Sequence, residues 1–133
     1  MTASEVLFDT WAWWEVLQGG PAGARLQRRY LDARGIQVLP SAISLGELSA
    51  KLSSQGSVEA IPPTMNSIRH ASAVVDVTGE PAIGAGVLRS HLRRRSRSAS
   101  LADAMVLATA RRQGALVLSM DRDLAGEPDV SAA

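Results

Sequence analysis

The stretch SLADAMVLATARRQGALVLSMDRDL, residues 100–124, decides how the rest of the chain is interpreted. It begins with Ser100, a residue type that caps helices, and it runs through small and apolar residues to Gly114, where a helix would end. The apolar run ALVLSM follows and predicts a buried strand. The stretch therefore predicts a helix–strand unit with one acid, Asp103, in the first helical turn and another, Asp121, just past the strand.

Similar units precede this one along the chain. Other short apolar runs predict strands at residues 5–9, 36–40 and 73–78, and a short edge strand is expected within residues 128–133. Helices are expected over residues 10–20 (with Thr10 as N-cap), 22–35, 41–56, 61–72 and 80–95. Strands that alternate with helices, and that are apolar throughout, indicate an α/β fold. We expect one domain, residues 1–133, whose parallel sheet of four to five strands carries helices on both faces.

The composition is that of a globular protein and sets limits on its chemistry. Hydrophobic residues make up 46% of the 133 residues and charged residues 20%, and the formal net charge is +1. The chain has no cysteine, which excludes disulfides, a thiol nucleophile and a thiolate metal site. We see neither a signal peptide nor a run long enough to span a membrane, and we expect a cytoplasmic protein without a membrane partner.

Acidic residues recur where the predicted strands end. Asp9 and Asp121 follow strands, and Glu47 and Asp103 are expected in the first turns of helices near the same rim. In an open parallel sheet, ligands bind beyond the carboxyl ends of the strands. Carboxylates that meet there repel one another unless one holds a proton or a cation joins them. Oxygen ligands of this kind suit Mg²⁺ or Mn²⁺.

Each acid also has a purely structural interpretation. The runs SLAD (residues 100–103) and SLGE (residues 44–47) resemble capping boxes, in which the acid satisfies backbone amides at the start of a helix. Acids in a first turn also favour the helix dipole. Asp9 and the MDRD run (residues 120–123) could belong to simple turns. A non-catalytic binding module of the same fold is therefore the alternative to a metal-dependent enzyme.

Other α/β classes fit less well. A receiver domain needs a lysine after its last strand, but the only lysine, Lys51, lies mid-chain in a predicted helix. A dehalogenase-type phosphatase needs Asp-x-Asp after the first strand, where this chain has Asp9, Thr10 and Trp11. No Gly-Lys-Ser/Thr sequence offers a nucleotide-binding loop. The two histidines, His70 and His91, form no evident triad.

The order of LFDT, SAISLGEL and the 100–124 stretch resembles a PIN-domain ribonuclease, in particular the VapC-type toxin of prokaryotic toxin–antitoxin pairs. The resemblance covers nearly the whole chain and implies a PIN-like domain that hydrolyses RNA with one or two Mg²⁺ or Mn²⁺ ions. It also implies a cognate antitoxin protein as partner and a homodimer. Two departures are Leu124, where phenylalanine is common, and the tryptophans that follow Asp9.

The resemblance also implies roles for individual residues. Four acids would bind the metal and act in catalysis: Asp9, Glu47, Asp103 and Asp121. The hydroxyls of Thr10 and Ser119 would support these acids, and Asp123 matches an extra acid with a less certain role.

Two further groups of residues have more than one interpretation. The basic stretch contains Arg89, Arg93, Arg94, Arg95 and Arg97. It could follow the phosphates of RNA, end a solvated helix or dock an acidic antitoxin segment. Trp11 and Trp14 share one helix face and Trp13 lies on another. These rings could pack in the core or an interface, stack on RNA bases, or receive an antitoxin helix.

Overall fold

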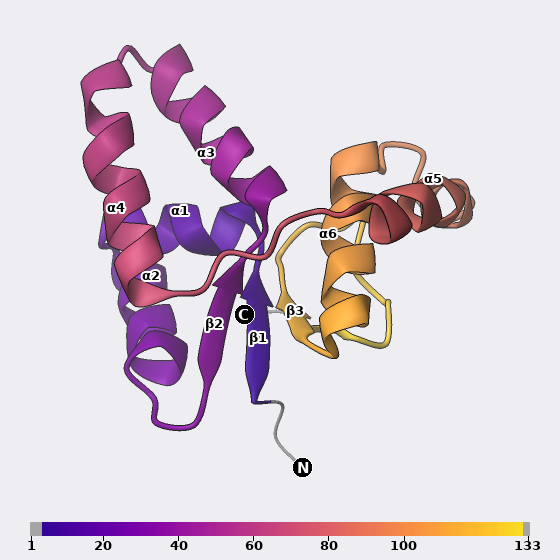
Figure 1. Ribbon diagram of the computed structural model, residues 1–133, viewed down its shortest axis with the longest axis horizontal. Helices are drawn as coiled ribbons and strands as arrows, with labels where there is room; N and C mark the ends of the chain where they lie inside the picture. Colours follow the sequence, from indigo (N-terminus) through magenta and orange to yellow (C-terminus); the bar gives the residue numbers. More distant parts are fainter. Residues whose placement is uncertain (1–3, 132–133) are drawn as a thin grey trace.

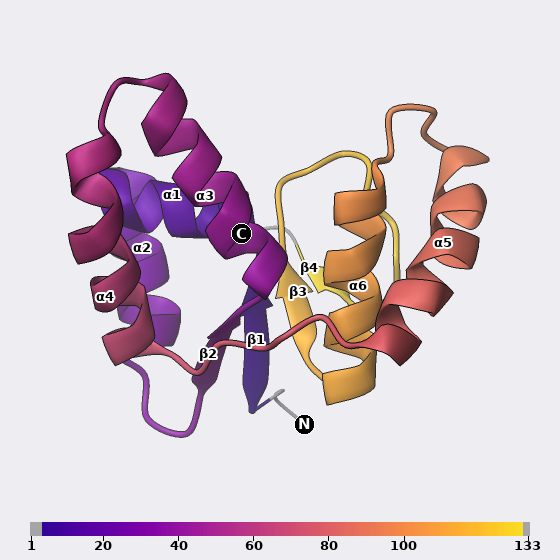
Figure 2. The same ribbon diagram turned by 45° about the horizontal axis from the view of Figure 1, so that its top comes forward.

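A parallel sheet of four strands forms the centre of the molecule. The computed structural model describes residues 4–131, and its strands are β1 (Glu5–Phe8), β2 (Gln37–Pro40), β3 (Leu116–Leu118) and β4 (Val130–Ser131). They lie in the order β2-β1-β3-β4, and each neighbouring pair is parallel (Figure 1 for β1 to β3, Figure 2 for β4). The α/β architecture predicted from the sequence is confirmed. The short edge strand expected within residues 128–133 forms at Val130–Ser131, and residues 132–133 lie outside the described residues.

Helices cover both faces of this sheet. The chain places α1 to α4 on one face and α5 and α6 on the other (Figures 1 and 2). The helices are α1 (Thr10–Gln18), α2 (Pro21–Leu26), a π-helical turn (Gln27–Leu31), α3 (Ala42–Ser54), a 3₁₀ turn (Val58–Ala60), α4 (Ile61–Ala71), α5 (Gly79–Arg93) and α6 (Leu101–Gln113). Within residues 4–131, no helix combines the length and the apolar character needed to cross a bilayer.

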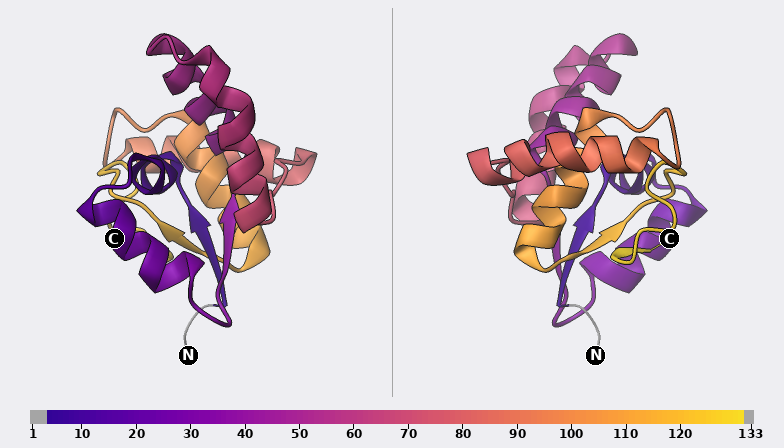
Figure 3. Two further views of the ribbon diagram at one scale, coloured as in Figure 1. Left: turned by 90° about the vertical axis from the view of Figure 1, so that its left-hand side faces the viewer. Right: turned by 90° about the vertical axis from the view of Figure 1, so that its right-hand side faces the viewer.

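The two helical layers bury opposite sides of the same strands. Successive strand side chains point to opposite faces. Leu7 accordingly packs in the cluster under α5 and α6, whereas its neighbours Val6 and Phe8 pack under α1 to α4. This two-sided burial explains why the strands are apolar throughout. Viewed from the side, α3 and α4 project past the carboxyl ends of the strands (Figure 3).

The quoted helix–strand unit forms as its sequence predicts. The Ser100 side chain accepts from the Asp103 amide, and the Asp103 side chain accepts from the Ser100 amide, so a complete capping box begins α6. The helix ends at Gly114, whose φ of 68° is left-handed and suits glycine. Strand β3 then enters the sheet between β1 and β4.

The strand predicted at residues 73–78 was wrong. This segment is the crossover that carries the chain from α4 on one face to α5 on the other (Figure 2). It passes the end of β2 at a single bridge, where Val75 donates to Pro40 O at 2.9 Å and accepts from the Ala42 amide at 2.9 Å. Its β-branched residues were the misleading signal, because a crossing segment has no strand alongside it to pair with.

Two helix boundaries also differ from the prediction. Asp9, not Thr10, is the N-cap of α1, because the Asp9 carboxylate accepts from the Ala12 amide. The helix expected over residues 22–35 ends at Leu31, before Gly35. Its last turn is wider than an α-helix, since the Asp32 amide donates five residues back to Gln27 at 2.8 Å.

Candidate active site

A cavity of about 390 Å³ opens at the carboxyl ends of β1 and β3. All four acids predicted for the site line it, and no lysine, arginine or histidine does. The lining residues are Asp9, Thr10, Trp11, Glu47, Asp103, Val106, Met120, Asp121 and Leu124. We refer to it as the acid cavity. The sheet thus brings together acids that are up to 112 positions apart in the chain, from Asp9 to Asp121.

Asp9 follows β1 and is the most buried of these acids, with 8% of its surface exposed. Its Oδ1 accepts from the Ala12 amide at 2.9 Å, which fixes the carboxylate at the start of α1. Burial raises the pKa of Asp9 to about 6, and the nearby charges of Asp121 and Glu47 act in the same direction. Hydrogen bonds from Ser119 and Ala12 oppose the rise in pKa without cancelling it.

Glu47 reaches the cavity from α3, although not from the position that the sequence predicted. The cap of α3 is Ser41, whose Oγ accepts from the Ile43 amide at 3.2 Å, and Ser44 is buried inside the helix. Glu47 therefore lies in the second turn, and the capping box expected at residues 44–47 is wrong. The helix begins where the range 41–56 predicted it, and this start leaves Glu47 beyond the first turn. Thr10 Oγ1 donates to Glu47 Oε1 at 2.6 Å and holds this exposed acid over the cavity.

Asp103 begins a helix and also lines the acid cavity. Its Oδ2 accepts from the Ser100 amide at 3.0 Å as part of the capping box. The carboxylate is nevertheless half-buried and lines the acid cavity. A capping acid keeps a second oxygen, so the cap orients the group without removing it from the site.

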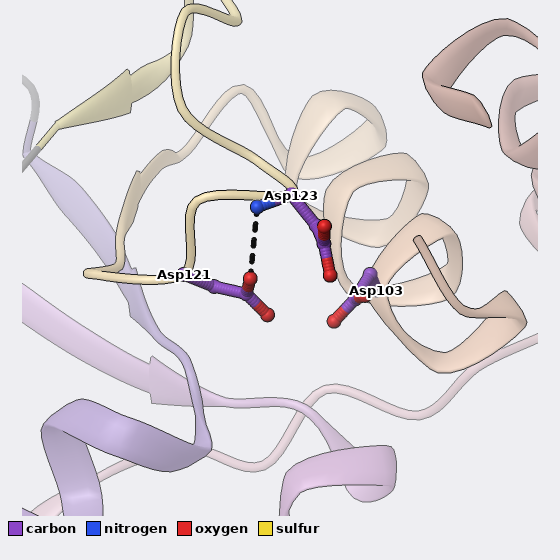
Figure 4. Close-up of side chains that lie close together, drawn as sticks. All are labelled: Asp103, Asp121 and Asp123. Carbon is purple, nitrogen blue, oxygen red and sulfur yellow. Dashed lines mark hydrogen bonds between the residues drawn. The ribbon is translucent and has the colours of Figure 1, made fainter. Parts of the chain in front are cut away.

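Asp121 and Asp123 come from the loop after β3. Ser119 Oγ accepts from the Asp121 amide at 3.0 Å, and Asp121 Oδ1 accepts from the Asp123 amide at 2.9 Å. Asp103, Asp121 and Asp123 each present one oxygen, and these oxygens lie within 4.8 Å of one another (Figure 4). Burial raises the pKa of Asp121, and the charges of Asp103 and Asp123 add to the rise.

Asp123 is stabilised in its charged form, unlike Asp121. The hydroxyls of Ser96 and Ser98, in the loop between α5 and α6, both donate to Asp123 Oδ1. These two hydrogen bonds lower the pKa of Asp123. Sequence reasoning did not link these serines to the acids, and their only signal is a hydroxyl-rich run, RSRSAS, just before the helix of Asp103.

The donor set fits a divalent cation. Carboxylates that share a cavity without a cationic side chain should resist ionisation, and the pKa values of Asp9 and Asp121 are raised as this argument requires. A hard cation such as Mg²⁺ or Mn²⁺ prefers such oxygen ligands and would relieve the repulsion. Asp103, Asp121 and Asp123 have oxygens close enough together to share one ion, and Asp9 and Glu47 offer further carboxylates in the cavity that Asp103 and Asp121 line.

The predicted basic stretch lies apart from the acid cavity, since none of its five arginines lines it. Two of them stabilise the fold locally. Arg93 Nε donates to Ala99 O at 2.9 Å, and Arg95 forms an ion pair with Glu127 at 3.3 Å. The other three, Arg89, Arg94 and Arg97, remain candidates for contact with a polyanion.

The tryptophans separate into different environments. Trp13 is buried in the core, 5.1 Å from the Phe8 ring centroid, and Trp14 lies under the Lys51 ammonium at 4.2 Å. Trp11 is half-buried and lines the acid cavity together with Met120. The sequence did not predict that these apolar side chains would border the acids, because which face of α1 turns toward the site depends on the packing of that helix.

Comparisons with known structures agree with the fold. Three solved structures share the fold over nearly the full length of both chains. VapBC2 from Rickettsia felis, bound to a promoter DNA fragment, is 13% identical, with a TM-score of 0.76 and 97% of each chain covered. A toxin–antitoxin complex from Klebsiella pneumoniae is 20% identical, with a TM-score of 0.68 and 96% of each chain covered. VapC20 from Mycobacterium tuberculosis, a toxin that cleaves the sarcin–ricin loop, is 22% identical, with a TM-score of 0.72 and 94% of this chain and 96% of that chain covered.

Sequence comparison gives two results. None of the curated protein sequences matches this chain. The family model of the PIN domain matches residues 6–126, a range that includes every acid of the cavity. The chain therefore belongs to the PIN domain family.

Proposed function

We propose that this protein is a metal-dependent endoribonuclease that hydrolyses RNA phosphodiester bonds. The observation that carries the proposal is that four acids from separate elements line one cavity at the carboxyl edge of the sheet, with no cation among the lining side chains. Membership of the PIN family and the shared fold with VapC20, a toxin that cleaves the sarcin–ricin loop, support this reaction. RNA as substrate is itself part of the proposal.

Asp9, Glu47, Asp103 and Asp121 would hold one or two Mg²⁺ or Mn²⁺ ions. Such an ion lowers the pKa of a bound water and polarises a phosphoryl oxygen, which supplies the hydrolytic chemistry. The protein's contribution is orientation. Backbone amides fix one oxygen each of Asp9, Asp103 and Asp121, and Thr10 fixes Glu47. The positions of these carboxylates are therefore set before a ligand arrives.

The supporting residues act on the acids and not on the substrate. Ser119 hydrogen-bonds Asp9 and also accepts from the Asp121 amide, so it couples the ends of β1 and β3. Ser96 and Ser98 hold Asp123. We propose that Asp123 is a secondary acid, because it neighbours Asp103 and Asp121 without lining the cavity.

The decisive experiment compares wild type with Asp103→Asn on a mixed RNA substrate, each with Mn²⁺, with Mg²⁺ and with EDTA. Asparagine can preserve the helix cap, so folding should survive. We expect cleavage by wild type only with metal, products with 5′-phosphate and 3′-hydroxyl ends, and no cleavage by the variant. A wild type that neither cleaves RNA nor binds metal by calorimetry would identify the protein as a non-catalytic binding module instead.

We also propose that the protein is the toxin of a type II toxin–antitoxin pair and binds a cognate antitoxin. The support is the shared fold with a toxin–antitoxin complex over 96% of each chain. An enzyme of this kind would meet RNA in the cytoplasm, the location expected from the sequence. Expression of the chain alone should arrest growth, Asp103→Asn should not, and co-expression of the adjacent reading frame should restore growth.

A homodimer through α5 completes the proposal. Ile83 and Val87 lie four residues apart on this helix and are 76% and 75% exposed. A pair of large apolar side chains on one helix face is a suitable centre for a self-complementary interface. Val87→Glu should convert the dimer to a monomer in light scattering after gel filtration. Val58→Glu, at another exposed apolar residue, should not.

A further inference from the structure

A second, smaller cavity adjoins the acid cavity. It measures about 150 Å³ and shares two of its lining residues, Trp11 and Met120, with the acid cavity. Its other walls come from α2 and the π-helical turn that follows, and include Arg25, Arg29 and Tyr30. We refer to it as the arginine groove. A ligand extending out of the acid cavity past Trp11 would enter it.

The inner surface of the groove is apolar and firmly packed. Tyr30 is buried, and its ring meets Phe8 of β1 edge-on at 5.7 Å between centroids. Trp11 is half-buried, and Met120 is 53% exposed directly after β3. The Met120 thioether and the Trp11 indole together present a flat, polarisable surface on which an aromatic ring of a ligand could pack.

The rim of the groove carries positive charge. Arg25 and Arg29 are four residues apart, so they lie on the same side of the helix, and both are exposed. The Arg29 guanidinium lies 5.5 Å from the Tyr30 ring centroid. In the part of the chain that the structure describes, neither arginine forms an ion pair, whereas Arg95 and Arg111 both do. The charge of the rim is therefore available to an anion.

We propose that the arginine groove binds the nucleotide next to the scissile phosphate, with its base against Trp11 and Met120 and its phosphate held by Arg25 and Arg29. The inference rests on the proposed ribonuclease function and adds a specificity site to it. Single-stranded RNA is recognised by stacking of bases on aromatic side chains and by cationic contact with the backbone. The groove supplies both features within one ligand length of the acids.

Size and charge favour RNA over a protein segment as the occupant. The groove, at about 150 Å³ against about 390 Å³ for the acid cavity, suits one planar ring and not the row of side chains on a docked helix. Two unpaired arginines suit a polyanion. A peptide ligand is the competing occupant that the experiment below excludes or reveals.

The first test measures RNA binding in the Asp103→Asn background, where cleavage does not interfere. The probe is a fluorescein-labelled single-stranded RNA of mixed sequence, followed by anisotropy with Mg²⁺ present. Arg25→Gln/Arg29→Gln should weaken binding about tenfold and reduce the salt slope by about 0.7, since the two arginines hold one phosphate and each phosphate contact of a single strand contributes about 0.7. The control, Arg34→Gln/Arg69→Gln, changes the net charge equally at exposed arginines outside the groove.

The second test measures sequence preference. Wild type, Trp11→Phe and Trp11→Leu would be compared on a random-sequence RNA, and the cleavage sites sequenced. Loss of stacking in Trp11→Leu should reduce the preference at one nucleotide beside the cut by roughly tenfold, and Trp11→Phe should retain part of it. If Trp11 only supports the fold, both variants slow cleavage of all sequences equally and leave the preference unchanged.

The outcomes separate the two proposals. An equal loss of RNA affinity in the groove and control variants, no loss in either, or no RNA binding at all would overturn the groove as an RNA site. An unchanged preference in Trp11→Leu would do the same. A wild type that binds RNA through Arg25 and Arg29 but cleaves none with metal would overturn the ribonuclease function while retaining the groove.

Discussion

The loop after β3 carries acids into two different environments. At its start, Asp121 and Asp123 face Asp103, and no cationic side chain lines the cavity that Asp103 and Asp121 border. At its end, Glu127 and Asp129 contact Arg111, and Asp129 accepts from Arg111 Nε at 2.8 Å. Fewer than ten residues separate an acid that lacks a positive partner from one that has it.

The pKa values of Asp129, Asp121 and Asp9 differ according to whether a cationic side chain contacts the acid. The Arg111 guanidinium holds the pKa of Asp129 below its usual range, whereas burial raises the pKa of Asp121 and, more strongly, that of Asp9. The charge on Asp129 therefore stabilises the fold, whereas the charges on Asp9 and Asp121 destabilise it. Ionisable groups that destabilise the folded protein are typical of functional sites. The contrast supports a ligand that supplies the missing positive charge.

The largest expected effect is on stability at neutral and alkaline pH without metal. The folded-state pKa of Asp9 is about 6, above the ordinary value of 3.8. The protonated group therefore favours folding below about pH 4, and this contribution is lost as pH rises through 6. At about pH 8 in EDTA, Asp9→Asn should be more stable than wild type by up to about 3 kcal/mol, since about two pKa units correspond to that free energy. Urea denaturation across pH measures it.

Asp129→Asn is the control for this experiment, because it should behave in the opposite way. The pKa of Asp129 is lowered, so its charge stabilises the fold above pH 4, and this contribution is lost as pH falls. The variant should be less stable than wild type at pH 8 and equal to it at low pH. If both variants shift stability in the same direction, the contrast between the two ends of the loop is not electrostatic.

Metal binding should relieve the destabilisation caused by the charged acids of the cavity, and it should not affect the ion pairs of Glu127 and Asp129. At 100 times its Kd, Mg²⁺ or Mn²⁺ should stabilise wild type by about 2.7 kcal/mol, because it binds the folded state. Asp121→Asn should lose this metal-dependent stabilisation and Asp129→Asn should retain it. Thermal melts with and without EDTA provide the measurement. Equal stabilisation of all three proteins would show that metal binds elsewhere.

The features that the sequence predicted are those governed by short-range chemistry. Ser100, Asp103 and Gly114 determine the two ends of α6 through hydrogen bonds within the helix and one left-handed residue. The placement of acids after β1 and β3 follows from the parallel sheet alone. These residues, and the order of the elements, could therefore be predicted without tertiary information.

The features that the sequence did not predict depend on contacts distant in the chain. Residues 73–78 have the composition of a strand and form only a bridge at Val75, because the chain needs them to cross the sheet. Glu47 lies a turn later in its helix than expected, since Ser41 caps α3 immediately after β2. Arg95, which was predicted to contact RNA, forms an ion pair with Glu127 that the sequence did not predict. Local sequence contains no signal for such partners.

Breaking the ion pairs at the end of the loop should have an intermediate effect. Glu127 is buried and contacts Arg95 at 3.3 Å and Arg111 at 3.5 Å, both of which are partly exposed. Glu127→Gln keeps the shape and removes the charge, and we expect a loss of about 1–2 kcal/mol in urea denaturation. Glu59→Gln, at an exposed acid, should change stability by less than about 0.5 kcal/mol. Comparable losses in the two variants would mean that these ion pairs do not stabilise the loop.

The substitution with the smallest expected effect on stability, at Thr10, should still weaken the binding of metal. Thr10→Val removes the 2.6 Å hydrogen bond to Glu47, and because that acid is exposed, the free energy of unfolding should change by only about 0.5 kcal/mol. A hydroxyl that only orients a metal ligand nevertheless affects affinity, and we expect Mn²⁺ to bind about tenfold more weakly by calorimetry. Thr10→Ser retains the hydroxyl and should bind Mn²⁺ as wild type does. A contrary result would be a Thr10→Val variant with a lower free energy of unfolding but an unchanged affinity for Mn²⁺. Glu47 would then stabilise the packing of α1 against α3, as Asp129 stabilises the fold through Arg111, and would not bind metal.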